Sequence, residues 1–501
     1  MLQDLSICSS REEDVKVKEV LFSVLKSLKN AVRAVAFLLI LAFLINIWIG
    51  WLKPKHFDGN LMMDAFYAQQ ENTVDLLVIG SSHTFVDVNT GTLWNDYGIP
   101  SFVIGGSLQP FWHSYYYLRE AVKTQTPRLV ILEALACNIE EDNTFPGIIF
   151  NNIYGMKWGM EKLESLRASV FDTDGLVDYT LFFEDYHNRY PELDMLDIAG
   201  DLGDPVRYED WKGFYDYFLT QYVDEPEFLD DVLPEPMVNK EEYYYRLILE
   251  YCRDNDIPLL IMVSPDGGYS NRARSHYVYA SEIADEYGFD FVDFNNYYDE
   301  IGLDFSLDFA DLGHLNHRGN RKFTEYLGDY LVDNYDFIDR RNDESGIYDS
   351  WADNYRYLEY RYDNYILSDT FDVTDYVGRL AELSEDYEVF VAISDLSYIT
   401  DEMRTYLGIN GIPSARPYDE RRWMIRGGNT TTLYADENGL YYEVYTGDHH
   451  LAVSTSGFYY DGQDLFAAVA GYNGVLIVVY DSYNQTVADA AVVFGTEIWR
   501  L

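Results

Sequence analysis

The sequence Asp75-Leu-Leu-Val-Ile-Gly-Ser-Ser-His-Thr-Phe85 joins an uninterrupted apolar run to a glycine and two serines. A short apolar run that ends at a glycine turn is typical of a strand buried on both faces of a parallel sheet. Similar runs recur further along the chain, at residues 101–104, 129–135, 259–263 and 289–292. The pattern predicts a buried sheet whose first strand, residues 74–80, leads directly into Ser81 and Ser82.

Helix-like stretches separate the predicted strands, at residues 112–124, 240–254, 273–287 and 318–334. Strands that alternate with helices of this length indicate a parallel sheet with helices on both faces. We therefore expect a three-layer, flavodoxin-like α/β domain over residues 70–338. An aromatic and acidic stretch, residues 141–238, interrupts the alternation, and we expect it to form a helical cap where open α/β folds bind ligands.

The chain of 501 residues is long enough for two folded units, and it is strongly acidic, with a net charge of −49. Residues 1–55 hold eight Lys/Arg and five Asp/Glu, which leaves 28 basic and 80 acidic side chains in the remainder. Because phosphate binding needs concentrated positive charge, nucleic acid is excluded as a partner. A solvated, self-repelling surface is the simplest interpretation, and a cation-rich partner or calcium is the alternative.

An uncharged run of 19 residues, 34–52, is long enough as a helix to cross a membrane. The run predicts a single transmembrane helix, with residues 1–33 in the cytoplasm and the domains that follow outside. The positive-inside rule gives this orientation, because only Lys53 and Lys55 follow the run closely, whereas five cations lie within 18 residues before it: Lys16, Lys18, Lys26, Lys29 and Arg33. A cleaved signal peptide is the alternative, although no small-residue cleavage site follows Leu52.

Two distant stretches carry residue types suited to nucleophilic catalysis. Ser82 lies directly after the first predicted strand, and Asp311-Leu-Gly-His314 lies far downstream, before a predicted helix. A serine hydroxyl needs a base to remove its proton, and the base needs a third group to orient it. Alone, the Gly-Ser-Ser turn fits an ordinary helix N-cap equally well. Asp308 and His317 are local competitors, and His317 is expected on the surface at the helix start.

With Gly80-Ser81-Ser82 and the late Asp311-x-x-His314, the chain resembles the SGNH (GDSL-type) hydrolase superfamily. The resemblance implies that Ser82 is the nucleophile, His314 the base and Asp311 the orienting acid, with Ser81 in place of the usual aspartate. It also implies three oxyanion donors, namely the Ser82 N–H, Gly105 with Gly106 as alternate, and an asparagine after the third strand. The third block reads Glu133-Ala-Leu-Ala-Cys-Asn138, where Asn138 is out of register and Glu133 is the alternative residue facing the site.

The predicted cap contains Tyr186-His-Asn-Arg-Tyr190, which is similar to a segment of anchored acyltransferase-like relatives. This similarity implies that His187 and Arg189 contact an anionic or sugar substrate, and a local ion pair of Arg189 with Glu184 is the alternative. His83, directly after the nucleophile, either faces the substrate or is a structural histidine. We expect no metal site and no cofactor, because the adjacent His449 and His450 would point to opposite faces of a strand.

Beyond a predicted linker at residues 339–365, short β-rich segments separated by turn residues predict a mostly β domain over residues 366–501. Two stretches, Val389-Phe-Val-Ala-Ile-Ser-Asp395 and Gly474-Val-Leu-Ile-Val-Val-Tyr-Asp481, resemble the PANDER or interleukin-like EMT inducer domain. The resemblance implies a sandwich-like module for interaction or glycan association. The three cysteines, at positions 8, 137 and 252, are too few for a disulfide framework.

Together these resemblances imply a membrane-anchored, extracellular serine acyltransferase or esterase. It would act on acetyl-like O-acyl groups of a cell-surface polysaccharide through an acyl-serine, beside a membrane-bound O-acyltransferase partner. A carbohydrate esterase with the same triad is the first alternative. A non-catalytic surface protein that binds glycan or protein is the second.

Overall fold

The structure is a computed structural model. It describes residues 26–41, 43–45, 47–48, 59, 61–139, 152–170, 211–229, 232–383, 387–393, 400–406, 422–427, 429–432, 440–446, 449–454, 458–465, 474–482 and 486–500.

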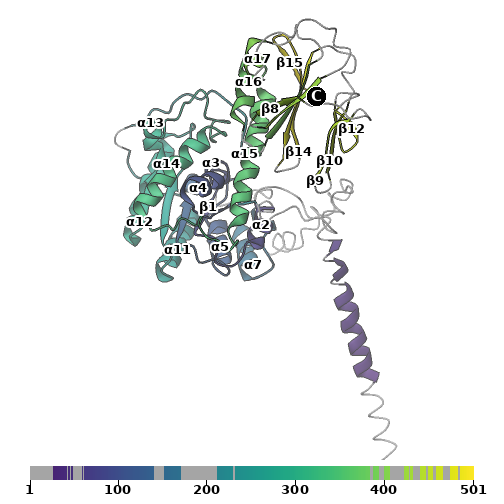
Figure 1. Ribbon diagram of the computed structural model, residues 1–501. Coiled ribbons are helices and arrows are strands. Elements are labelled where there is room, and N and C mark those ends of the chain that lie inside the picture. The colour runs from purple at the N-terminus through teal and green to yellow at the C-terminus, as the bar shows by residue number, and fades with distance from the viewer. Residues whose placement is uncertain are drawn as a thin grey trace, which may run out of the picture.

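Five short strands form a parallel sheet in the order β2-β1-β3-β4-β5 (Figure 1). They are β1 (Leu76–Gly80), β2 (Ser101–Gly105), β3 (Leu129–Glu133), β4 (Leu259–Val263) and β5 (Asp290–Asp293). Every residue of the first four strands is buried, which explains their continuous apolar sequence. The order reverses between β1 and β3, so the carboxyl ends of these two strands border the crevice where such sheets bind ligands. The predicted α/β fold is confirmed.

Helices cover both faces of this sheet. On one face α5 (Phe111–Ala121) contacts α7 (Met160–Ser169) and α11 (Asn239–Asp254), which also contacts α12 (Asn271–Tyr287). On the other face α4 (Thr90–Tyr97) contacts α14 (Gly319–Asn334). The shorter elements of this unit are α2 (Met62–Ala68), α3 (Ser82–Asp87), η2 (Leu135–Asn138), η5 (Phe294–Tyr297) and α13 (Tyr298–Ile301). Cys137 and Cys252 are buried free thiols.

The predicted helical cap, residues 141–238, is helical in one described part, which includes α7, and not in another. Residues 211–229 contain no helix and instead run across the sheet edge as an extended segment, which we name the strap. Its backbone bonds to three separate places: the Lys212 carbonyl accepts from Val103 N at 3.0 Å, Tyr215 N donates to Phe85 O at 2.7 Å, and Gln221 N donates to Phe309 O at 2.9 Å. These bonds replace the helical ones that the prediction assumed. His187 and Arg189 lie outside the described residues.

The predicted linker, residues 339–365, contains most of the long helix α15 (Asp349–Asp369), a regular element that the sequence pattern did not indicate. One side of α15 packs on α4: Asn354 Oδ1 accepts from Thr90 Oγ1 at 3.2 Å, and Leu358 packs so closely on Gly91 that a Cβ there would lie 2.8 Å from its Cδ1. Buried Trp351 donates its ring N–H to the Ser101 carbonyl at 3.0 Å. These spacings of three, four and seven residues form one helical face.

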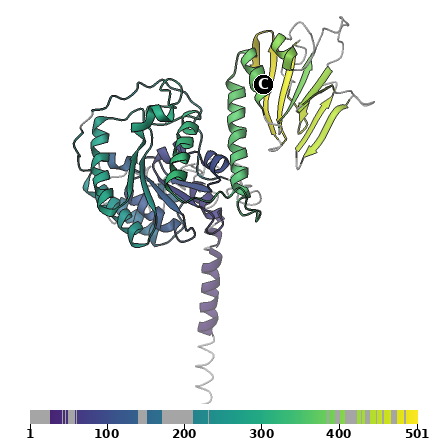
Figure 2. The ribbon, with the colours of Figure 1, turned by 60° about the vertical axis from the view of Figure 1, so that its left-hand side comes forward.

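The C-terminal part contains two antiparallel sheets, as expected for a mostly β unit (Figure 2). The larger has the order β15-β14-β13-β6-β7-β8, and the smaller β12-β11-β10-β9. The strands are β6 (Tyr387–Ile393), β7 (Arg422–Gly427), β8 (Asn429–Thr432), β9 (Leu440–Thr446), β10 (His449–Ser454), β11 (Phe458–Tyr460), β12 (Gln463–Asp464), β13 (Val475–Asp481), β14 (Thr486–Phe494) and β15 (Glu497–Arg500), and the helices α16 (Val373–Glu382) and α17 (Asp401–Tyr406).

Strand β13 is buried on both faces, which explains its unbroken apolar sequence. Val475, Ile477 and Val479 share a core with residues of α15 and α16, such as Leu367 and Tyr376. The alternate residues of β13 share a second core with β10 and β11: Leu476, Val478 and Tyr480. The larger sheet therefore lies between helices and the smaller sheet.

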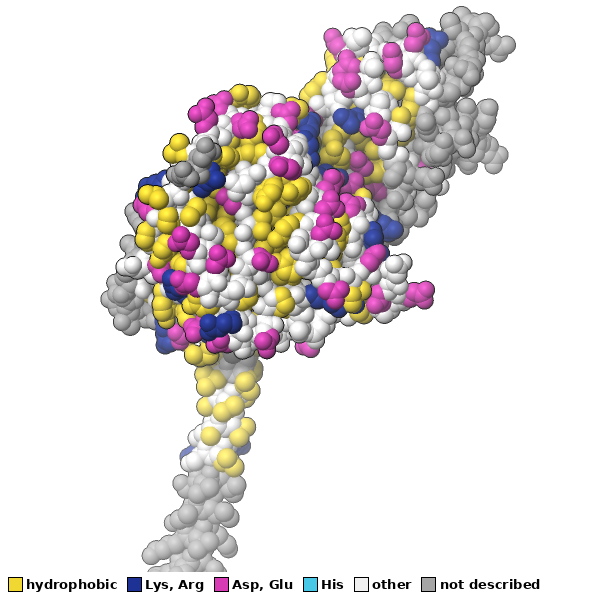
Figure 3. All heavy atoms as spheres, turned by 90° about the vertical axis from the view of Figure 1, so that its left-hand side faces the viewer, with side chains coloured by type: hydrophobic (Ala, Val, Ile, Leu, Met, Phe, Trp, Pro, Cys, Tyr) yellow, Lys and Arg dark blue, Asp and Glu magenta, His cyan; other side chains and the backbone are white. Residues whose placement is uncertain are grey.

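Near the N-terminus, the helix Lys26–Ile45 is long and apolar enough to cross a membrane, and its side chains are not covered by the rest of the protein. It overlaps the predicted span of 34–52, and residues 47–48 are helical as well. In Figures 1 and 2 this helix projects away from the five-stranded unit. On the face shown in Figure 3, acidic side chains are dispersed singly or in small groups among uncharged ones, as expected for a solvated acidic surface.

The packing of α15 predicts that Trp351→Ala will destabilise the five-stranded unit. Removing this buried ring leaves a cavity and an unpaired Ser101 carbonyl, so we expect a loss of about 3–5 kcal/mol in the free energy of unfolding. Urea unfolding of the full chain in detergent measures the loss. Tyr357→Ala, on the exposed side of the same helix, should cost less than about 1 kcal/mol. Equal losses for the two variants would contradict the docking of α15.

Candidate active site

The turn after β1 places Ser82 at the first residue of α3. Gly80 is required there, because a Cβ at this position would lie 2.5 Å from the Cβ of Glu133 and 2.7 Å from Thr84 Cγ2. Ser81 is the N-cap of α3, and its hydroxyl accepts a hydrogen bond from His83 N at 3.3 Å. The serine that fits an ordinary N-cap is therefore Ser81, which leaves the Ser82 side chain available for another role.

The carboxylate of Glu133, at the end of β3, holds this turn in place. Its Oε2 accepts hydrogen bonds from Ser81 N at 3.0 Å and from Ser81 Oγ at 2.7 Å. Its Oε1 accepts from Leu135 N at 2.6 Å. Burial raises the pKa of Glu133, although these hydrogen bonds oppose the shift. Glu133 thus lies beside the turn that carries Ser82, whereas from the sequence it was only an alternative to Asn138.

Ser82, His314 and Asp311 form a continuous row of hydrogen bonds. His314 Nε2 lies 2.7 Å from Ser82 Oγ, and His314 Nδ1 lies 2.9 Å from both carboxylate oxygens of Asp311. Partial burial would raise the pKa of Asp311, but its hydrogen bonds with His314 and with the N–H groups of Gly313 and His314 lower it overall. An ionised Asp311 fixes Nδ1 as the protonated ring nitrogen, so Nε2 can take the Ser82 proton.

Helix α3 also fixes the loop that carries His314. Asp87, at the end of α3, accepts a hydrogen bond at its Oδ1 from the backbone N–H of Leu315 at 3.1 Å. The loop closes on itself through a bond from Ala310 N to the carbonyl of His314 at 2.9 Å. Burial raises the pKa of Asp87. The same helix therefore positions both the serine and the histidine, and sequence reasoning missed Asp87.

His83 was predicted to contact substrate, and it is instead buried behind His314. The two rings meet edge to face with centroids 5.2 Å apart. Burial lowers the pKa of His83 to about 3, so the ring is neutral at physiological pH. Tyr217 of the strap packs on another side of His314, with a ring distance of 5.7 Å. These neighbours orient the His314 ring, and they favour a structural role for His83.

The predicted oxyanion donors have different surroundings. The Ser82 N–H lies in the first turn of α3, where a helix provides no acceptor for it. The Gly105 N–H donates to Met62 Sδ at 2.9 Å, and Gly106 N donates to the Gly80 carbonyl at 3.3 Å. An oxyanion role for Gly105 would therefore require Met62 to move. Asn138 ends η2 and is partly exposed, and its role as a donor stays a prediction.

Asp266, which follows β4, is a further acid beside the catalytic loop that sequence reasoning missed. A Cβ at Gly313 would lie 3.9 Å from Asp266 Oδ1, 3.9 Å from Asp311 Oδ1 and 3.6 Å from His83 Nε2. Burial, with the nearby charges of Glu133 and Asp311, raises the pKa of Asp266 to about 7. The motif Ser264-Pro-Asp266 after an apolar strand was the available signal.

The two local competitors for the triad have other roles. Asp308 is buried and accepts hydrogen bonds from Asp304 N at 2.7 Å and from Lys322 Nζ at 2.5 Å. His317, predicted to lie on the surface, is only 1% exposed, because the rings of Phe218, Tyr362 and Tyr365 surround it. Neither side chain is bonded to Ser82 in the part of the chain that is described.

The raised pKa of Asp266 predicts that Asp266→Asn will stabilise the folded protein, and that this stabilisation will depend on pH. The folded state holds this proton more tightly than the unfolded state, whose carboxyl titrates near pH ~4. The wild-type protein therefore loses stability as the pH rises from about 4 to about 7, on the order of 3–4 kcal/mol, and the variant does not. We expect its melting temperature, measured relative to wild type, to increase between pH 4 and pH 8. Exposed Asp299→Asn is the control, and a pH-independent difference for Asp266→Asn would contradict the assignment.

The bond between Met62 and Gly105 predicts that Met62→Leu will speed the modification of Ser82 by a fluorophosphonate. Leucine keeps the volume but lacks the sulfur acceptor, so the Gly105 N–H is released for the developing oxyanion. One such donor contributes roughly a hundredfold in rate, which sets the upper limit of the gain. Met63→Leu, an equally buried neighbour, is the matched control. If both variants react at the wild-type rate, Gly105 has no part in the oxyanion site.

A scan against protein-family models finds no match for this chain. A search of curated proteins finds none either. Among the solved structures that match is a crystal structure of a Bacteroides fragilis protein with the provisional name of acylhydrolase. It is 12% identical, the alignment covers 54% of this chain and 94% of that chain, and the TM-score is 0.26. A likeness of this degree carries no argument about chemistry, which depends here on the geometry of the side chains.

Proposed function

We propose that the protein is a serine-dependent acyl-transfer enzyme of the SGNH type, with Ser82 as nucleophile, His314 as base and Asp311 as orienting acid. The observation that carries the proposal is the continuous hydrogen-bonded row from Ser82 Oγ through both ring nitrogens of His314 to Asp311. Four further groups, from β3, α3 and the strap, support this row: Glu133, Asp87, His83 and Tyr217. Such support is what a site that must hold its geometry requires.

The chemistry takes two steps. Ser82 Oγ attacks the carbonyl carbon of an ester while its proton passes to His314 Nε2, and the Ser82 N–H stabilises the oxyanion. His314 then gives the proton to the leaving alcohol, which leaves an acyl group on Ser82. An acceptor hydroxyl, from water or from a sugar, next loses its proton to His314 and attacks the acyl-serine. The bond between the acyl group and Ser82 Oγ then breaks, His314 returns its proton to Oγ, and the acylated acceptor or the free acid is released.

The proposed substrate is an acetyl-like O-acyl group on a cell-surface polysaccharide. The apolar helix Lys26–Ile45 supports an anchor that holds the catalytic unit outside the cell, with the N-terminus in the cytoplasm. An enzyme at that location meets envelope polymers and can work beside a membrane-bound O-acyltransferase that supplies acyl groups. We propose that the C-terminal β unit serves interaction or glycan association, with the PANDER-like domain as its model.

Hydrolysis of the same esters is the second candidate, because water and a sugar hydroxyl would use the same triad. Ser82 is partly exposed, so water can reach it in this conformation. The two candidates differ in whether the acyl-serine reacts with water or with an added alcohol. A transferase should transfer the acyl group to the alcohol even when the alcohol concentration is low. A purely binding role has less support, because it would not need an aligned base beside Ser82.

Labelling with a fluorophosphonate tests the proposal directly. We expect the full chain in detergent to gain one adduct by intact mass, on the peptide that contains Ser82. Ser82→Ala should gain none, and His314→Ala should react at least about a thousandfold more slowly, since the base is lost. Asp311→Asn should slow the reaction through the wrong tautomer of His314.

Ser306→Ala, which removes an exposed hydroxyl that bonds Asp304, is the matched control and should label like wild type. Circular dichroism and melting temperature verify that each variant is folded. A folded wild-type chain that stays unlabelled, under conditions that modify a known serine esterase, would overturn the proposal. The binding role would then be favoured.

A further inference from the structure

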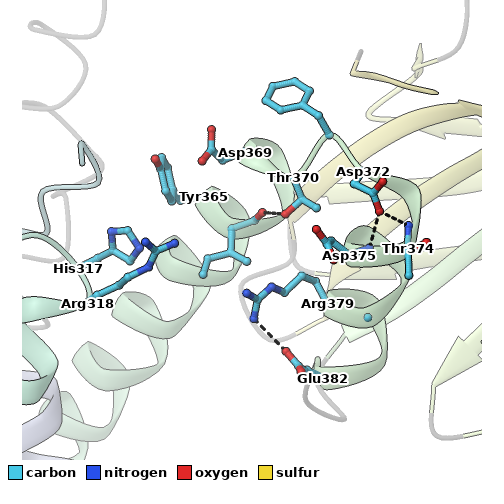
Figure 4. A pocket seen from close by; sticks show the side chains of 13 residues that line it. His317, Arg318, Tyr365, Asp369, Thr370, Asp372, Thr374, Asp375, Arg379 and Glu382 are labelled. Atoms are coloured by element: carbon cyan, nitrogen blue, oxygen red, sulfur yellow. Dashed lines mark hydrogen bonds and ion pairs between the residues drawn. The ribbon is translucent and has the colours of Figure 1, made fainter. Parts of the chain in front are cut away.

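A cavity of about 540 Å³ lies between the start of α14 and the helices α15 and α16, outside the triad. Figure 4 shows His317 and Arg318 on one side of it, Tyr365, Asp369 and Thr370 beside them, and the residues of α16 opposite. A space of this size is in the range of small-ligand sites. Its walls come from both folded units, since α14 belongs to the five-stranded unit and α16 packs in the core of the β unit.

The lining offers both signs of charge and two aromatic faces. Arg318 and Arg379 stand among four carboxylates, and two threonine hydroxyls add neutral donors: Asp369, Asp372, Asp375, Glu382, Thr370 and Thr374. The carboxylates would repel an anionic ligand, and the arginines would repel a cationic one that passes close to them. A neutral ligand that is rich in hydroxyls can donate to the carboxylates and accept from the guanidinium groups.

Several of these side chains are already held in place. Asp372 caps α16 by accepting from Thr374 N at 2.8 Å and from Asp375 N at 3.1 Å, and Arg379 bonds Glu382 at 3.1 Å. Tyr365 stacks on Phe218 with ring centroids 4.4 Å apart. A ligand would therefore meet a largely preformed surface and would pay little to order it. Phe371, which also lines the cavity, is 66% exposed, so its ring face is accessible to a ligand.

His317 is a second, independent pointer to a ligand. Its ring lines the cavity and is 1% exposed, yet neither Nδ1 nor Nε2 has a hydrogen-bond partner in the described part of the chain. Burial lowers the pKa of His317 to about 4, so the ring is neutral and has one donor and one acceptor to satisfy. An unpaired buried group of this kind is costly, and a ligand hydroxyl that displaces one of the surrounding rings would provide a partner.

The cavity is next to the triad in sequence and in space. His317 follows His314 by three residues, and the adjacent strap residues Tyr217 and Phe218 contact one histidine each. His317 N also donates to the Tyr217 carbonyl at 2.8 Å. Tyr217 therefore packs on the histidine that is bonded to Ser82, and Phe218 packs on the histidine that lines the cavity.

We propose that this cavity is a binding subsite for an uncharged saccharide chain, and that it holds the polymer whose hydroxyls take part in the reaction at Ser82. The role of the bound chain in that reaction rests on the function proposed above, whereas binding itself does not. Hydroxyls pair with the mixed charges and with His317, and the faces of Tyr365 and Phe371 cover the apolar faces of sugar rings.

Binding of defined hexasaccharides to the full chain in detergent tests the proposal. The probes are neutral hexamers of glucose, mannose and N-acetylglucosamine, a cationic glucosamine hexamer and an anionic galacturonate hexamer, each measured by isothermal titration. We expect at least one neutral hexamer to bind more tightly than either charged one. Phe371→Ala and Asp375→Asn should each weaken it by roughly tenfold, and exposed Tyr243→Ala on α11 should leave it unchanged.

Fluorophosphonate labelling of the same preparation separates the two proposals. Saccharide binding that depends on Phe371 and Asp375 supports the subsite even if Ser82 stays unlabelled, in which case only the proposed catalysis fails. A labelled protein that binds none of the neutral hexamers overturns the subsite and leaves the catalysis standing. Preferred binding of a charged hexamer, or neutral binding that Phe371→Ala and Asp375→Asn do not weaken, also overturns it.

Discussion

The hydrogen bonds between Glu133 and Ser81 are the interaction on which the site depends. They tie the end of β3 to the turn after β1, at the place where the order of the sheet reverses. The turn has little freedom, since the neighbouring Gly80 is already in contact with Glu133. A carboxylate that accepts from both the backbone and the hydroxyl of the N-cap fixes the direction in which α3 begins. Because Ser82 is the first residue of α3, the same hydrogen bonds fix its position.

From this fixed start, α3 organises the remaining chemistry within six residues. It carries Ser82 at its beginning and Asp87 at its end, and Asp87 bonds the backbone beside His314. Ser82 and His314 are 232 residues apart in sequence, but one short helix positions both. Small structural changes in the long segment between Ser82 and His314 therefore have little effect on the distance between these two side chains. The cost is several buried carboxyl groups, whose pKa values burial raises.

The sequence indicated the sheet and the triad because both leave local signals. Apolar runs that end in glycine mark β1 and β2, and the spacing of Asp311 and His314 fits a single turn. Other features depend on tertiary contacts that no local pattern carries. The helix α15 is rich in tyrosine, aspartate and arginine, so its narrow buried face at Trp351 and Leu358 was easily missed. In the sequence His317 resembles an exposed polar residue, because the rings that bury it come from distant segments. Nothing in the sequence indicates that Met62 accepts a hydrogen bond from the N–H of Gly105.

The two folded units are joined by a continuous helix, which has a consequence for multivalent binding. The 21 residues of α15 pack on α4 near one end, and at the other end the Arg500 side chain of β15 bonds the carbonyls of Leu367 and Thr370. Ordering a flexible linker costs entropy whenever two sites engage one polymer, and that cost grows with linker length. In this protein α15 is already ordered in the folded chain, so no such entropy is lost when a polymer binds. A polymer that contacts both units is therefore bound as if by one surface. Its effective concentration at the second site depends on the fixed geometry of α15 and not on the distribution of end-to-end distances of a flexible linker.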